Sequence, residues 1–146
     1  MGFIYNDALL EIAAGGVDSG ATWELMLLHG DLDTYLPNRD HHFVSDLVPA
    51  ITELSTAGYG RRTLSGFALA LDRSNARVGV HFDGETYLGI GSSPYPTVSA
   101  GVIYRKVTDD SDSVLFAYID SISAPTNGSD LAVIFDVTGA MRLVAS

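Results

Sequence analysis

The residues whose types could bind a metal lie together in the segment Asp40-His41-His42. Imidazole and carboxylate groups are suitable ligands for zinc, manganese or iron, and further aspartates lie nearby in the sequence. However, side chains of adjacent residues point apart on a strand, and no His-Glu-x-x-His or similar spacing occurs. We therefore expect these residues to be solvated or to cap a loop, and we predict no metal and no other cofactor.

A second acidic cluster, Asp109, Asp110 and Asp112, partly matches the spacing of a calcium-binding loop. It lacks the glycine and the distal bidentate glutamate that such a loop requires. We interpret it as the solvent-facing tip of a hairpin. Replacing the three aspartates with asparagine should then leave folding and attachment to any partner intact.

Catalytic patterns are missing from the sequence. The serines form no Gly-x-Ser-x-Gly elbow, the glycines do not match a phosphate-binding loop, and the chain has no cysteine nucleophile. The carboxylates are too scattered to indicate a glycosidase pair. The sequence therefore predicts a protein that is not an enzyme.

Arg61-Arg62 is a local basic pair in an acidic chain. An arginine can bind a carboxylate through two parallel hydrogen bonds, so the pair could anchor a contact with a partner protein. The alternative is an ordinary ion pair within the chain, which contributes little when it is exposed. We retain both as candidate partner-contact residues.

The strongest structural signal is the stretch Val98–Ser123. Two runs rich in β-branched and aromatic residues, Ser99–Tyr104 and Val114–Ile122, flank an acidic turn. In the second run both alternating faces are apolar, which is typical of a strand buried on both sides. We predict a hairpin at the centre of the fold.

The remaining pattern predicts one all-β domain over residues 1–146, a β-sandwich or barrel of about eight strands. Helical spacing predicts a short helix at Asn6–Ala14, capped by Asn6 or Asp7 and ended by Gly15-Gly16. This helix either covers one end of the core or reaches a neighbouring subunit. The other strands are expected at Trp23–Leu28, Arg61–Leu71, Ala76–Phe82, Tyr87–Ile90, Leu131–Val137 and Met141–Val144.

The segment His29–Gly60 shows no sustained period and is long for a loop in a compact domain. Its aromatic and aliphatic residues argue against disorder, so we expect an ordered excursion that packs on the core or on a partner. Tyr35 and Phe43 in this segment, together with Phe3 near the N-terminus, are further candidate partner contacts.

Charge and hydropathy exclude several partners. The formal net charge of −10 disfavours binding to nucleic acid, because such binding depends on basic side chains that neutralise the phosphates. It also disfavours binding to anionic membranes. No apolar run approaches the roughly 18 residues of a membrane span. A hydrophobic fraction of 47% suggests that some apolar surface is buried between subunits.

Blocks of sequence spread over much of the chain resemble a family of small virion structural proteins of tailed bacteriophages. The chain departs from that family at Asp83–Thr97, where the family has a tryptophan-containing strand. The matching blocks are Met26-Leu27-Leu28, Tyr35-Leu36-Pro37, Asp40–Leu47, Glu53-Leu54, Gly58-Tyr59, Arg61–Leu64, Ala100–Lys106, Leu115–Asp120 and Phe135-Asp136-Val137.

The resemblance implies a non-enzymatic component of the virion. Our first hypothesis is a capsid decoration or cement protein on the outer capsid surface, made in the host bacterial cytoplasm. It would contact the major capsid protein and itself, as a homotrimer, and neither nucleic acid nor a membrane. The alternatives are a head–tail connector or tail-associated ring subunit and, from a different class, a carbohydrate-binding module or virion hydrolase.

Overall fold

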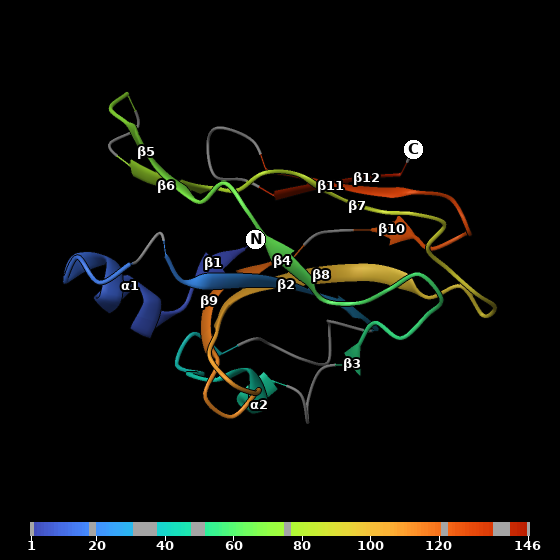
Figure 1. Ribbon diagram of the computed structural model, residues 1–146, viewed down its shortest axis with the longest axis horizontal. Helices are drawn as coiled ribbons and strands as arrows, with labels where there is room; N and C mark the ends of the chain where they lie inside the picture. The colour runs from blue at the N-terminus through green and yellow to red at the C-terminus, as the bar shows by residue number, and fades with distance from the viewer. Residues whose placement is uncertain are drawn as a thin grey trace.

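The computed structural model is built mainly of antiparallel strands (Figure 1). It describes residues 2–17, 20–30, 38–47, 52–74, 77–120, 123–135 and 141–145. The all-β fold class predicted from the sequence is confirmed, although the strands are more numerous than expected. Within the described residues, none of the helices has the length and apolar character needed to cross a membrane.

The predicted central hairpin is confirmed. β8 (Thr97–Lys106) pairs with β9 (Val114–Ile119) on one side and with β2 (Thr22–His29) on the other. Most residues of these three strands are buried on both faces, as the apolar runs indicated. The large sheet has the order β1-β9-β8-β2-β3, with β1 at Phe3–Ile4 and β3 at Thr52–Glu53.

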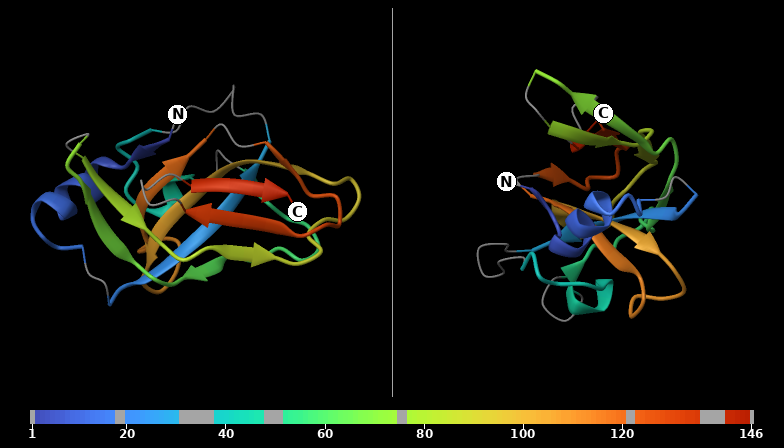
Figure 2. Two further views of the ribbon diagram at one scale, coloured as in Figure 1. Left: turned by 90° about the horizontal axis from the view of Figure 1, so that it is seen from above. Right: turned by 90° about the vertical axis from the view of Figure 1, so that its left-hand side faces the viewer.

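A second, three-stranded sheet lies over the large one and gives the fold a sandwich-like form (Figures 1 and 2). Its middle strand is β11 (Leu131–Phe135), between β12 (Met141–Ala145) and β7 (Glu85–Tyr87). β10 (Ala124–Pro125) pairs with β8 of the large sheet. Buried aromatic rings join the two layers: Trp23 packs edge-on against Phe116 and Phe82, and Phe82 contacts Phe135.

The expected single strand Arg61–Leu71 is wrong, because it divides into β4 (Arg62–Leu64) and β5 (Ala68–Asp72). Gly66 interrupts it with φ +68, and a Cβ at that position would lie 2.3 Å from the Asp83 carboxyl carbon. β4 joins β2 of the large sheet, whereas β5 pairs with β6 (Arg77–His81) in a separate hairpin.

The expected strand Tyr87–Ile90 is also misplaced. The strand in this region, β7, ends at Tyr87, and Gly89 follows in a turn with φ +55. A left-handed residue of this kind favours glycine and does not continue a strand.

The N-terminal helix is confirmed as α1 (Asn6–Ala13), and Gly15 follows its end with φ +73. The cap prediction is wrong: Tyr5 occupies the N-cap position and makes no side-chain cap bond. Asn6 and Asp7 instead bond to the segment that precedes α2 (Val44–Leu47). α1 lies beside β9, with Ala8 buried against the core.

The described parts of the His29–Gly60 segment are ordered and packed on the core, as expected. Val44, Leu47 and Leu54 are each buried, at 0%, 0% and 2% exposure. The backbone also ties this segment to the sheet, since Leu54 N donates to Leu27 O at 2.9 Å. The segment therefore forms part of the domain rather than a loose loop.

Candidate functional site

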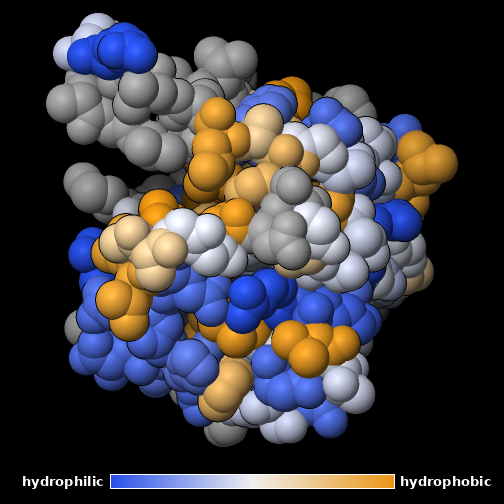
Figure 3. Space-filling view, turned by 60° about the vertical axis from the view of Figure 1, so that its left-hand side comes forward, coloured by the Kyte–Doolittle hydropathy of each residue, from blue (hydrophilic) through white to orange (hydrophobic). Residues whose placement is uncertain are grey.

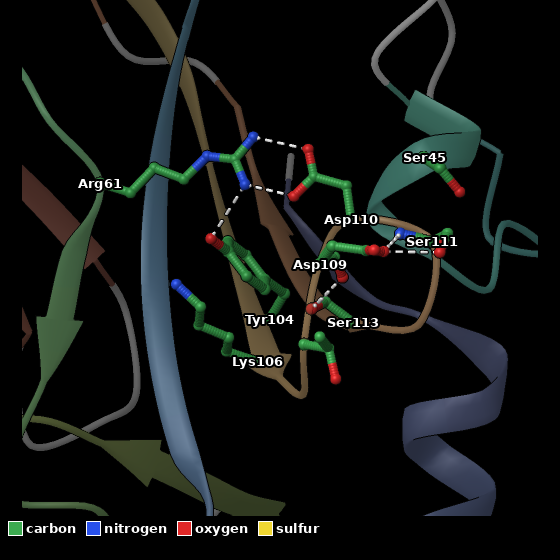
Figure 4. Close-up of a pocket in the computed structure, with 9 residues that line it drawn as sticks. Ser45, Arg61, Tyr104, Lys106, Asp109, Asp110, Ser111 and Ser113 are labelled. Atoms are coloured by element: carbon green, nitrogen blue, oxygen red, sulfur yellow. Dashed lines mark hydrogen bonds and ion pairs between the residues drawn. The ribbon is translucent and has the colours of Figure 1, made fainter.

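Arg61 forms the centre of the most extensive polar cluster in the described part of the chain. Its Nε and Nη2 donate to the two carboxylate oxygens of Glu53, at 2.9 and 2.8 Å. Its Nη1 and Nη2 donate to Asp110, at 2.5 and 2.9 Å. A fifth bond runs from Nη1 to Tyr104 Oη at 3.2 Å (Figure 4). Because a guanidinium has five N–H donors, every donor of Arg61 is used.

Glu53 is itself held from a second side. Tyr59 Oη donates to Glu53 Oε1 at 2.8 Å and accepts from the backbone N–H of Leu27 at 3.1 Å. Burial raises the pKa of Tyr59 above its ordinary value, so the phenol stays protonated and keeps donating. This chain of bonds fixes β3 and the segment before β4 against β2.

Tyr104 extends the cluster into the large sheet. Its hydroxyl donates to Glu24 Oε2, and Lys106 Nζ donates to Glu24 Oε1 at 2.9 Å. Glu24 is only 7% exposed, so these two partners compensate for the burial of its charge. Burial, followed by the bond to Glu24, raises the pKa of Tyr104. Two cations thus face three carboxylates across β2, β3, β8 and the β8–β9 turn.

The acidic turn between β8 and β9 is bound to this cluster, so the interpretation as a purely solvent-facing tip is wrong for Asp110. The Arg61 hydrogen bonds hold the pKa of the Asp110 carboxyl below its usual value. The Asp110 carbonyl also accepts from Ser45 N at 2.8 Å, which ties the turn to α2. Asp112 has a local role, since it accepts from the backbone N–H groups of Thr108 and Asp109.

An open cavity of about 480 Å³ lies between this turn and β8. Most of its polar lining is already bonded within the chain. Ser111 Oγ donates to Asp109 Oδ1 at 2.5 Å, and Ser113 Oγ donates to the Asp109 carbonyl at 2.6 Å. These two bonds hold the turn itself together, whereas the bonds from Arg61 to Asp110 in Figure 4 tie the turn to the polar cluster.

Arg62 has a different environment from Arg61. Its guanidinium lies over the ring of Tyr87, 4.8 Å from the centroid, a favourable cation–π contact. Both members of the basic pair are therefore used within the chain in this structure. The interpretation as an intramolecular pair fits Arg61, and a partner contact for Arg62 stays a prediction.

Phe3 and Phe43 lie along the same edge of β9 but at opposite ends of the strand. Phe3 pairs with Tyr118, and Phe43 forms a bridge with Val114 at the other end of the strand. Both side chains are half-buried. A partner contact through them stays a prediction, and Tyr35 lies outside the described residues.

The Asp40-His41-His42 segment joins α1 to the rest of the domain. Asn6 Nδ2 donates to Asp40 Oδ1 at 2.6 Å, and His42 Nδ1 contacts Asp7 Oδ2. Asp46 accepts from the backbone N–H groups of His42 and Phe43, and these bonds lower its pKa. Among the described residues, no group of three or more His, Asp or Glu side chains is placed to hold a metal ion.

The sequence analysis missed most members of the Arg61 cluster. One signal was available: Glu24 is a charged residue inside the apolar run of β2, and a buried charge requires a partner. Its partners could not be read from the sequence, because Tyr104 and Lys106 lie 80 and 82 positions away.

Comparisons of this chain with protein-family models, with curated proteins and with solved structures found no match.

Proposed function

We propose that this chain is a non-enzymatic structural protein of a tailed-bacteriophage virion, acting as a capsid decoration or cement protein. The sequence blocks that resemble this family support the proposal. Several of them meet in space, since Glu53, Tyr59, Arg61, Tyr104 and Lys106 all belong to the polar cluster described above. The cluster stiffens the domain, which suits a protein whose task is to hold other subunits in place.

The observation that carries the proposal is the fixed position of α1. Three polar contacts brace it: Asn6 with Asp40, Asp7 with His42, and Glu11 with Arg105 at 3.0 Å. The braced helix nevertheless keeps two large apolar side chains in solvent: Leu9 and Leu10 are 44% and 68% exposed.

Such exposed leucines are suited to contact a partner because the helix is already ordered. Binding through a fixed element does not have to offset the entropy of ordering it. On the face seen in Figure 3, hydrophobic residues lie in small groups among hydrophilic ones, so each contact would be modest in area.

Attachment to a symmetric shell compensates for weak individual contacts. When a homotrimer docks on neighbouring capsid subunits, the second and third contacts form at high effective concentration. The major capsid protein is the proposed partner, and the leucines of α1 supply one contact per copy.

Quantitative mass spectrometry of purified virions tests the proposal. We expect a copy number comparable to that of the major capsid protein. A small number of copies, as in a ring, would instead place the chain at the head–tail junction or tail and refute the decoration assignment.

A matched pair of variants tests the role of α1. Leu10→Asp should abolish binding to particles that lack this protein. Leu88→Asp should not, although Leu88 is equally exposed at 70% and follows β7 in a different part of the fold. Circular dichroism checks that both variants are folded. Equal binding of the two variants would remove α1 from the contact.

A further inference from the structure

The β5–β6 hairpin stands apart from the two larger sheets. Within the described residues its strands pair only with each other, in a register that runs from Ala68↔His81 to Asp72↔Arg77. Figures 1 and 2 show it projecting beyond the rest of the domain. A two-stranded hairpin is at best marginally stable alone, so an element of this kind gains from a further strand.

The base of the hairpin is nevertheless held firmly. Phe67 stacks on Trp23 with centroids 5.4 Å apart, and Asp83 N donates to Ser65 O at 2.8 Å. Val80 packs against the core, whereas Leu69, its neighbour across the hairpin, is 51% exposed. β5 is therefore fixed at its root while Leu69 is exposed to solvent.

The two edges of the hairpin differ in composition. Exposed edge strands usually carry lysine, proline or other charges that prevent pairing with another chain. β6 has a charged residue, Arg77, at one end and a polar residue, His81, at the other. β5 reads Ala-Leu-Ala-Leu-Asp, so its one charge is Asp72 at the end. β5 is the less protected edge.

We propose that β5 pairs antiparallel with β5 of a second copy, around a two-fold axis at Ala70. Asp72 then lies opposite Ala68 of the second copy, so the two Asp72 residues do not face each other. Combined with the known register, the four-stranded rows read Arg77-Asp72-Ala68-His81, Val78-Leu71-Leu69-Val80 and Gly79-Ala70-Ala70-Gly79.

These rows complement one another. The second row is aliphatic across all four strands, and its symmetry mate repeats it on the same face of the sheet, because side chains alternate with a period of two. Asp72 keeps its register position opposite its own Arg77. This two-fold contact does not rest on the proposed function.

Cysteine cross-linking tests the proposal, because the chain contains no cysteine. Directly opposite residues of antiparallel strands have Cα atoms about 4.5–5.5 Å apart, within the span of a disulfide. In Ala70→Cys, the thiols of the two copies should form a disulfide. Oxidised glutathione takes up their two electrons and two protons and leaves as two molecules of reduced glutathione. A covalent dimer should then appear on a non-reducing denaturing gel.

Two control variants make the result decisive. Gly79→Cys lies on the other edge, about 14 Å from its counterpart across three strand spacings, and should cross-link poorly. Leu88→Cys, exposed in the turn after β7, reports random collision. The proposal is overturned if Ala70→Cys forms dimer no faster than Leu88→Cys, or if Gly79→Cys forms it as fast as Ala70→Cys.

Light scattering supplies a second readout without a covalent bond. Ala70→Lys would set two like charges opposite each other, which is destabilising in a sheet. We expect the mass of the native assembly to halve while the circular dichroism spectrum is retained. An unchanged mass for folded Ala70→Lys, or a wild-type chain that is monomeric, would contradict the two-fold pairing.

Discussion

Replacing Arg61 with lysine tests whether the forked guanidinium, rather than its charge alone, holds the polar cluster together. Lysine keeps the positive charge but has three donors on a flexible stem. It can replace only part of the four bonds that Arg61 makes to Glu53 and Asp110, at 2.5–2.9 Å. The β8–β9 turn and β3 would lose part of their mutual attachment.

The magnitude follows from the number and exposure of these bonds. A hydrogen bond to a charged group contributes about 1.5–3 kcal/mol when buried. The side chains of Arg61, Glu53 and Asp110 are 24%, 28% and 37% exposed, so solvent screening favours the lower end of this range. With a net loss of one to two bonds, we expect Arg61→Lys to lower the free energy of unfolding by about 2 kcal/mol.

Arg105→Lys is the matched control. The Arg105 side chain is 27% exposed, close to that of Arg61, and it pairs with Glu11 through Nη2 at 3.0 Å. An ion pair of this kind contributes about 0.5 kcal/mol or less. Urea unfolding followed by the fluorescence of Trp23, the one tryptophan of the chain, measures both variants. If both variants lost the same free energy of unfolding, the reasoning would be refuted, because the five hydrogen bonds of Arg61 would then stabilise the fold no more than the single bond of Arg105.

Three further changes have defined outcomes. The pKa values of Asp110 and Asp46 lie below the ordinary 3.8. The stability that these ionised carboxylates contribute is therefore present above pH 3.8 and is lost as pH falls through the folded-state pKa values. In an acid titration, the free energy of unfolding of Asp110→Asn should fall less steeply with decreasing pH than that of the wild type. The pKa of Tyr104 is raised above 10.0 by burial first and then by its hydrogen-bonded carboxylate, so stability should fall as pH rises beyond 10.0, together with tyrosinate absorbance. Gly66→Ala places a side chain at a left-handed position beside the Asp83 carboxylate, so it should lower the free energy of unfolding by at least about 1 kcal/mol. Gly60→Ala should lower it less, because the space around a Cβ at Gly60 is open. Chemical denaturation measures both variants.

The strands could be predicted wherever burial dictated the pattern. β9 is apolar on both faces, and only a position inside the sandwich satisfies such a sequence. The prediction failed at Gly66, where the alternation of Arg61–Leu71 continues through a break in the strand. An alternating pattern indicates which residues are buried, but it does not reveal a single left-handed residue, such as Gly66, at which the chain passes from one sheet to another.

The candidate site was harder to predict because its contacts are distant in sequence. Arg61 was identified as a candidate, but its bonds reach residues 8, 43 and 49 positions away. Which carboxylates meet it depends on the pairing of β2 with β8 and on the folding of the β8–β9 turn. The exposure of Leu9 and Leu10 was likewise undetermined until α1 was placed against β9.

The most direct test of the proposed function is a cryo-electron microscopy map of an intact particle that carries this protein. We expect density for the β-sandwich on the outer capsid surface, repeated over the lattice, with α1 facing the major capsid protein. Density confined to the portal or the tail would contradict the decoration assignment, as would a capsid-bound copy with α1 directed away from the shell.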